Sequence, residues 1–202
     1  MPATIPEPVM DDLKARHAEP QRAYHTWAHI ADMLQQYEAA RPLLSHPFAF
    51  RLAVLFHDAI YDPKSATNES DSAKLLRTTM GHLAPEMDIS CAEALILATQ
   101  KHTPAMVQPP FLSDAQLFLG IDLSILGADE GRFDRYDGAI RQEYAFVPLQ
   151  TYCEKRAEIL QGFLDRPRIY FTDRYADRLE NPARSNLKRA IKRLAATAGT
   201  TG

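Results

Sequence analysis

Histidine and aspartate residues lie inside or directly after two mostly apolar runs of the sequence. Asp122 lies inside the run LFLGIDLSIL, and the pair His57 and Asp58 directly follows the run FAFRLAVLF. Burying a carboxylate costs several kcal/mol unless it is paired or bound to a cation. Each of these residues taken singly is more often a hydrogen-bonded core residue. Together they indicate one shared polar centre.

Two further histidines precede these positions. His25 and His29 are four residues apart, which places both side chains on one face of a helix. Imidazole and carboxylate groups suit a borderline or harder divalent cation, such as manganese, iron, zinc, nickel or magnesium. We therefore expect a divalent metal site, and a bound cation would lower the pKa of a coordinated water.

The spacing of apolar residues predicts an all-α protein, because helical periodicity dominates and no stretch alternates like a strand. The first helix is expected over about 22–44. A nearly all-apolar second helix, over about 47–60, should be buried on most sides and carry His57 and Asp58 in its last turn. Further helices are expected over about 70–83, from about 90 onward, and over about 113–126, 129–144, 148–164 and 182–196.

Four features define the ends of these helices. Ser90 and Ser113 begin apparent capping boxes, so each is expected to start a helix. Gly127 fits a C-terminal stop. Pro182 fits the first position of the last helix.

Length and composition favour one soluble domain over residues 1–202, with a metal-binding core at about 22–127 and C-terminal helices at about 129–197. The net charge of -3 argues against nucleic-acid binding. Cys91 and Cys153 are far apart and have no CxxC spacing, so neither a disulfide framework nor a thiolate zinc site is expected. Without a signal pattern or a membrane-length apolar run, we expect a cytoplasmic protein with no membrane partner. The sequence leaves a homo-oligomer open.

The order H…HD…D on separate helices resembles the HD superfamily of metal-dependent phosphohydrolases. The flanking residues are similar to those of a subgroup of predicted HD phosphohydrolases that begins with Tyr-His-x-x-x-His. The similarity covers most of the chain, in the segments YHTWAHI (24–30), FHDAIYD (56–62), NESDS (68–72), DLSILG (122–127), IRQEY (140–144) and ARSNL (183–187).

This resemblance implies an all-α bundle of the HD type and a set of four metal ligands. The implied ligands are His29, His57, Asp58 and Asp122. His29 matches the first histidine of the family better than His25, because a hydrophobic residue follows it. His25 then becomes a catalytic pocket residue that donates to a phosphate or supports a ligand, unless it only bonds to a helix neighbour.

Three more residues have roles that the resemblance leaves open. His102 is similar to a histidine of members that bind two metals, so a second ion remains an alternative to the single ion that we expect. Asp62 stands where hydrolases of the alarmone (p)ppGpp carry the second acid of a pair, although Tyr61 replaces the first acid. Asp62 would assist proton transfer or cap a turn before proline. Glu69 would reach the site or begin a helix.

The implied activity is hydrolysis of a phosphate ester or phosphoanhydride in a nucleotide-like small molecule by metal-activated water. Arg141, Arg184 and Lys101 are candidates for phosphate binding, because charge on the phosphate must be neutralised. Two other functions remain open: a di-iron oxygenase of the HD type, which would need His102, and a non-catalytic protein that keeps the metal and senses a nucleotide.

Overall fold

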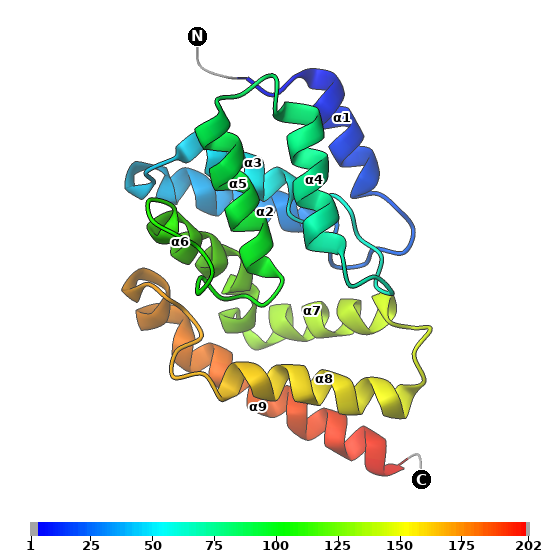
Figure 1. Cartoon of the computed structure of the whole chain (residues 1–202). Coiled ribbons are helices and arrows are strands. Elements are labelled where there is room, and N and C mark those ends of the chain that lie inside the picture. Colours follow the sequence, from blue (N-terminus) through cyan, green and yellow to red (C-terminus); the bar gives the residue numbers. More distant parts are fainter. Residues whose placement is uncertain (1–3, 201–202) are drawn as a thin grey trace. The chain divides into compact units, whose positions relative to one another are not determined.

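The computed structural model describes residues 4–200, and within that part of the chain all regular structure is helical (Figure 1). The all-α prediction is thereby confirmed. In chain order the elements are α1 (Glu7–Arg16), α2 (Trp27–Ala40), the 3-10 helix η1 (Arg41–Leu43), α3 (Pro47–Phe56), α4 (Asn68–Met80), α5 (Glu86–Thr99), α6 (Leu112–Asp122), the 3-10 helix η2 (Leu123–Gly127), α7 (Glu130–Glu143), α8 (Leu149–Leu164) and α9 (Asp173–Thr200).

The chain divides into two compact units, with the boundary between Ile121 and Asp122. The first unit holds α1 to α6, and the second holds η2 and α7 to α9. Asp122 is at the same time the last residue of α6. Its position is therefore fixed by a helix of the first unit.

Helix α3 forms the centre of the first unit. It packs against α2, α4 and α5, and the side chains from Leu52 to Phe56 are at most 1% exposed. Phe50 lies between Tyr37 of α2, with ring centroids 5.9 Å apart, and Phe118 of α6, at 5.3 Å. This confirms the prediction that the apolar second helix is buried on most sides. The core it builds ends directly at His57.

Two predicted helix ends near the site are wrong. Helix α2 begins at Trp27, so the segment before it, including His25, is not helical. Helix α3 ends at Phe56, and His57 and Asp58 form the turn that follows instead of the last helical turn. Both segments make a tertiary contact that local sequence patterns do not signal, because Arg22 donates hydrogen bonds to the backbone carbonyls of His25 and Asp58.

The predicted capping boxes are also wrong. Helix α5 begins at Glu86 after Pro85, and Ser90 lies inside it with its hydroxyl donating to Glu86 at 3.0 Å. Helix α6 begins at Leu112, so Ser113 lies in its first turn. Helix α1 was not predicted, because Leu13 is its one buried residue and no apolar stripe signals a helix there.

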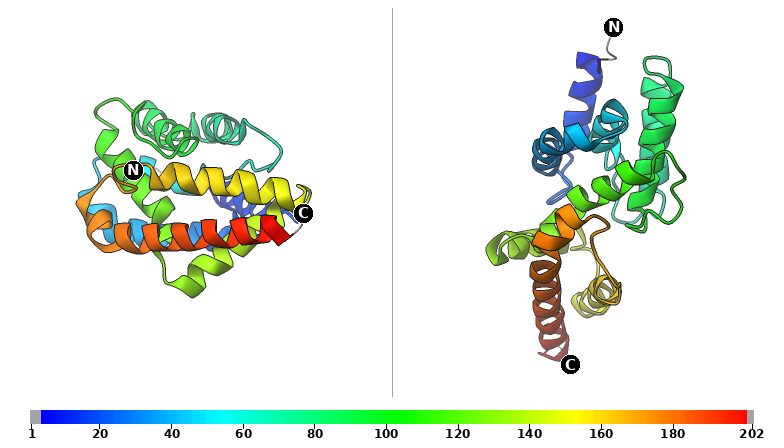
Figure 2. Two further views of the ribbon diagram at one scale, coloured as in Figure 1. Left: turned by 90° about the horizontal axis from the view of Figure 1, so that it is seen from below. Right: turned by 90° about the vertical axis from the view of Figure 1, so that its left-hand side faces the viewer.

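Helices α8 and α9 lie side by side in the second unit, as both views of Figure 2 show. The prediction that the last helix starts at Pro182 is wrong, because α9 begins at Asp173 and continues through the proline. Proline removes a hydrogen bond to the carbonyl four residues earlier, here that of Arg178. Both residues are exposed, so water can satisfy that carbonyl. Buried Tyr175 and Leu187 anchor the helix on either side.

Gly127 is required for close packing in the second unit. It ends η2, but its φ is not in the left-handed region, so it is not a helix stop of the predicted kind. A Cβ there would lie 2.7 Å from Cβ of Leu179. We expect Gly127→Ala to lower the free energy of unfolding by about 1–3 kcal/mol.

Gly138 is the matched control for this substitution. A Cβ on this exposed α7 residue meets no atom within 4 Å, so Gly138→Ala should raise the free energy of unfolding by about 0.5–1 kcal/mol through helix propensity alone. Urea unfolding measures both variants. Equal effects of the two substitutions would contradict the packing role of Gly127.

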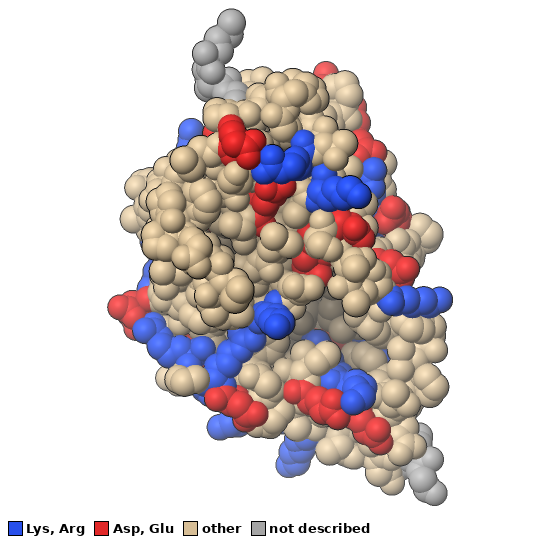
Figure 3. Space-filling model, viewed as in Figure 1, with Lys and Arg blue, Asp and Glu red and all other residues tan. Residues whose placement is uncertain are grey.

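Basic and acidic side chains lie close to one another on the face drawn in Figure 3. Helix α9 carries a basic stretch near the C-terminus, made of Lys188, Arg189, Lys192 and Arg193. Arg189 and Arg193 each lie 2.7 Å from a carboxylate oxygen of Asp134. Asp134 therefore offsets part of the positive charge of α9 within the second unit. Among the described residues, no helix is long and apolar enough to cross a membrane.

Candidate metal centre

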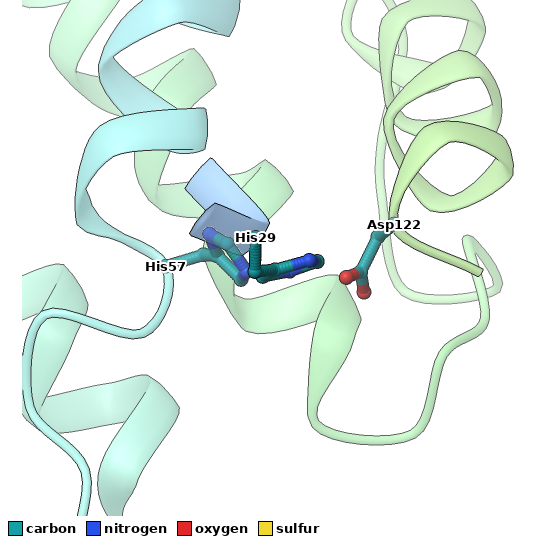
Figure 4. Close-up of side chains that lie close together, drawn as sticks. All are labelled: His29, His57 and Asp122. Carbon is teal, nitrogen blue, oxygen red and sulfur yellow. The ribbon is translucent and has the colours of Figure 1, made fainter. Parts of the chain in front are cut away.

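Three of the four implied ligands form a group that could hold a metal ion. One ligand atom each from His29, His57 and Asp122 lies within 4.8 Å of the others (Figure 4). His29 comes from the first turn of α2, His57 follows α3, and Asp122 ends α6. Three elements far apart in sequence therefore bring nitrogen and oxygen donors to one point.

The two histidine rings are held so that their Nε2 atoms face each other at 3.3 Å. His57 Nδ1 lies 3.0 Å from the carbonyl of Val54, which can only accept, so Nδ1 carries the proton. In the neutral form of the ring, Nε2 presents a lone pair, whereas in the protonated form it donates to Asp58. His29 Nδ1 lies 3.2 Å from the hydroxyl of Tyr24. Both rings thus have the outer hydrogen bonds that orient metal-binding histidines.

Asp58, the fourth implied ligand, lies beside the same two rings. Its Oδ2 is 2.9 Å from Nε2 of His57 and 4.0 Å from Nε2 of His29. Burial acts to raise the pKa of Asp58, but the neighbouring imidazoles, His57 foremost, outweigh it and hold that pKa below its ordinary range. The carboxylate therefore stays ionised and available to a cation.

Arg22, which the sequence patterns did not single out, supports the turn that carries this centre. Its side chain is fully buried and pairs with Glu19 at 3.1 Å. The guanidinium also donates to the carbonyls of Asp58 at 2.7 Å, Ala59 at 3.2 Å and His25 at 3.1 Å. One arginine thus ties the segment before α2 to the turn after α3. No local spacing signals such a long-range role.

His25 lies at the edge of the centre. Its half-buried ring stacks on Tyr61 with centroids 4.2 Å apart, and lies edge-on to His29 at 6.5 Å. The pocket position predicted for His25 is compatible with this arrangement, although it is reached from a loop and not from a helix face.

Asp62 and Glu69 occupy the loop after the centre and the start of α4. Asp62 is exposed, and its Oδ1 accepts from the backbone N–H of Lys64 at 2.9 Å, as an aspartate in a turn before proline does. Asn68 bonds to the backbone of Asp62 through both its amide atoms. Glu69 is half-buried in the first turn of α4. Their catalytic roles stay predictions.

His102 and Lys101 follow the end of α5. His102 has a φ of 45°, in the left-handed region. The backbone N–H of Thr103 donates to the carbonyl of Ala98, and the backbone N–H of His102 donates to the carbonyl of Thr99, both at 3.2 Å. This pair of hydrogen bonds commonly ends helices. Among the described residues, His102 belongs to neither group that could hold a metal. Lys101 is exposed.

Arg141 and Arg184 use their guanidinium groups on backbone carbonyls of the second unit. Arg141 donates to Tyr144 and Val147, which closes the turn between α7 and α8. Arg184 pairs with Glu180 at 2.8 Å, and it donates to the carbonyl of Leu164 at the end of α8 and to those of Arg166 and Pro167 in the loop before α9. These contacts account for both arginines structurally, and their phosphate-binding role stays a prediction.

His17 is a further buried histidine, 2% exposed at the end of α1. Burial is the main cause that lowers its pKa to about 4. The folded chain therefore keeps His17 neutral between about pH 6.5 and pH 4, whereas the unfolded chain binds a proton there. The free energy of unfolding should fall as the pH drops through this window, and the contribution of His17 is fully present above it.

The substitution His17→Gln should make this acid sensitivity smaller, because glutamine does not titrate. Urea unfolding of both proteins between pH 4 and pH 7 gives the comparison. Parallel pH profiles for the two would show that His17 does not contribute.

Comparisons of the chain with models of protein families, with curated proteins and with solved structures found no match. The resemblance to the HD superfamily therefore rests on the sequence motifs alone. What the structure adds is the juxtaposition of histidine and aspartate groups that could hold a metal ion.

Proposed function

We propose that this chain is a metal-dependent phosphohydrolase of the HD type. The observation that carries the proposal is the meeting of His29, His57 and Asp122, within 4.8 Å of one another, with the ionised Asp58 beside them. This is the ligand set that the sequence motifs imply, and it comes from three separate helical elements.

The residues present fit a divalent cation. His57 offers an Nε2 lone pair because its Nδ1 proton is engaged by Val54. Asp58 and Asp122 each place a carboxylate beside the two histidines, and a positive charge there would stabilise both carboxylates. A cation bound there would polarise a phosphoryl oxygen and lower the pKa of a coordinated water.

The surrounding residues orient the ligands and exclude bulk water. Arg22 fixes the backbone of Asp58 and Ala59, so the His-Asp pair keeps one orientation. Phe118 packs edge-on to His57 with centroids 5.8 Å apart and closes the centre on its core side. The other side, toward His25 and Tyr61, is half-buried and gives the substrate its access.

His25 is the residue proposed to bind the substrate phosphate. Its ring is positioned by Tyr61 and lies next to the ligand His29. An imidazole N–H would donate to a phosphoryl oxygen, and an imidazolium would also neutralise charge. Asp62 would assist proton transfer only after giving up its bond to Lys64. We therefore expect His25→Ala to impair hydrolysis more than Asp62→Asn.

Phosphate release from a panel of phosphate esters tests the proposal. The panel contains nucleoside mono-, di- and triphosphates and sugar phosphates, each with added Mn²⁺. We expect turnover of at least one nucleotide, lost in Asp122→Asn and kept in Asp177→Asn, a control at an exposed α9 residue. Nucleotide binding without turnover would instead indicate a sensor. Iron-dependent oxygen consumption would indicate an oxygenase.

A further inference from the structure

A second group of possible ligands lies elsewhere in the first unit. One ligand atom each from His46, Cys91 and Asp114 lies within 4.8 Å of the others. His46 precedes α3, Cys91 is in the middle of α5, and Asp114 is in the first turn of α6. None of these residues belongs to the sequence motifs or to the proposed hydrolytic centre.

His46 directs an unsatisfied nitrogen into this group. Its Nδ1 atom is buried and has no hydrogen-bond partner among the described residues. The nearest carboxylate oxygen, Oδ2 of Asp114, is 3.5 Å away, too far for a good hydrogen bond. The ring packs edge-on to Phe111 with centroids 5.3 Å apart, which holds it in place. A buried polar atom without a partner calls for an explanation, and the ability to bind a cation is one.

Asp114 and Cys91 complete the group from the core side, and both are fully buried. Asp114 accepts from the backbone N–H of Ser45 at 3.0 Å and of His46 at 2.8 Å, which fixes its carboxylate against the loop before α3. Each carboxylate oxygen retains a further lone pair. Asp88 lies one turn before Cys91 on α5, on the same helix face, and offers another carboxylate.

We propose that His46, Cys91 and Asp114 form a second metal site, which binds zinc. Nitrogen, thiolate and carboxylate donors together suit zinc, which takes four ligands in a tetrahedral arrangement. Asp88 or water provides the fourth. The site joins the start of α3 to α5 and α6, so bound zinc would stabilise the first unit. This inference is independent of the proposed hydrolysis, because the two groups share no residue.

Zinc binding at this site must displace a proton. Burial, with Asp114 and Asp88 adding to it, raises the pKa of the Cys91 thiol to about 12, so the thiol is protonated at neutral pH without a cation. The sulfur–zinc bond forms as the S–H bond breaks, and the proton passes to water.

Cobalt substitution tests the site, because Co²⁺ bound to a thiolate gives a near-ultraviolet sulfur-to-cobalt charge-transfer band. The hydrolytic centre contains no sulfur and cannot give this band. We expect the band in the full-length protein, its loss in Cys91→Ser and its retention in His57→Ala. Cys153→Ser is the matched control, since Cys153 is also buried and free but lies in the second unit.

Zinc content provides the second readout. After removal of metal and dialysis against limiting zinc, His57→Ala should retain one tightly bound zinc per chain, and Cys91→Ser should lose that zinc. Circular dichroism verifies that both variants fold. A protein that binds Co²⁺ without the charge-transfer band, or a band that persists in Cys91→Ser, would overturn the proposal, whatever the outcome of the hydrolysis assays.

Discussion

Replacing His57 with alanine should weaken divalent metal binding at the hydrolytic centre by at least about 100-fold and abolish hydrolysis. Substitution of a residue that only orients a ligand already costs about 10–100-fold, and His57 is placed as a ligand itself. Its Nε2 faces His29 at 3.3 Å and Asp58 at 2.9 Å, so its removal opens the group on two sides. Mn²⁺ titration by calorimetry and phosphate release measure the two effects.

His82→Ala is the control for this experiment. His82 is an exposed histidine after α4 and belongs to neither possible metal group among the described residues. The His82→Ala substitution should leave both the Mn²⁺ affinity and the turnover unchanged. If His57→Ala kept full Mn²⁺ affinity and full turnover while folded, the assignment of the centre would be wrong.

Replacing Arg22 with alanine should destabilise the first unit by about 3 kcal/mol or more. Three backbone carbonyls would lose their donor, and each unsatisfied buried group costs about 1–3 kcal/mol. Glu19 would also lose its buried partner. With roughly 2–4 °C of melting temperature per kcal/mol for a chain of this size, scanning calorimetry should record a drop of roughly 6–12 °C.

Two variants make the result specific. Arg22→Lys should recover only part of the loss, because one ammonium group does not reproduce the fork that reaches three carbonyls. Arg41→Ala removes an arginine that is 61% exposed and pairs with exposed Glu38, so it should change the stability by less than about 0.5 kcal/mol. Equal melting temperatures for Arg22→Ala and Arg41→Ala would contradict the role of Arg22.

The sequence was sufficient to predict the all-α fold, and it pointed to His29, His57 and Asp122, whose metal binding stays a prediction. His57, after an apolar helix, and Asp122, inside an apolar run, both signal a buried polar site. The family motifs then selected His29 over His25. Helix ends were predicted less well, because capping patterns at Ser90 and Ser113 are local and the actual starts are set by packing.

Long-range contacts explain what the sequence left unpredicted. Arg22 closes the turn after α3 across more than thirty residues, and nothing near it in sequence signals that role. His46, Cys91 and Asp114 come from three separate elements without motif spacing. Such groups become visible only when the helices are packed.

Metal removal and restoration tests the central claim most directly. The chain is stripped with a chelator, and phosphate release from the best nucleotide of the panel is measured before and after Mn²⁺ is returned. We expect that turnover disappears on stripping and returns with Mn²⁺ in the wild type but not in Asp122→Asn. Turnover that survives complete removal of metal, or Mn²⁺ binding at the centre without turnover of any phosphate ester, would contradict it.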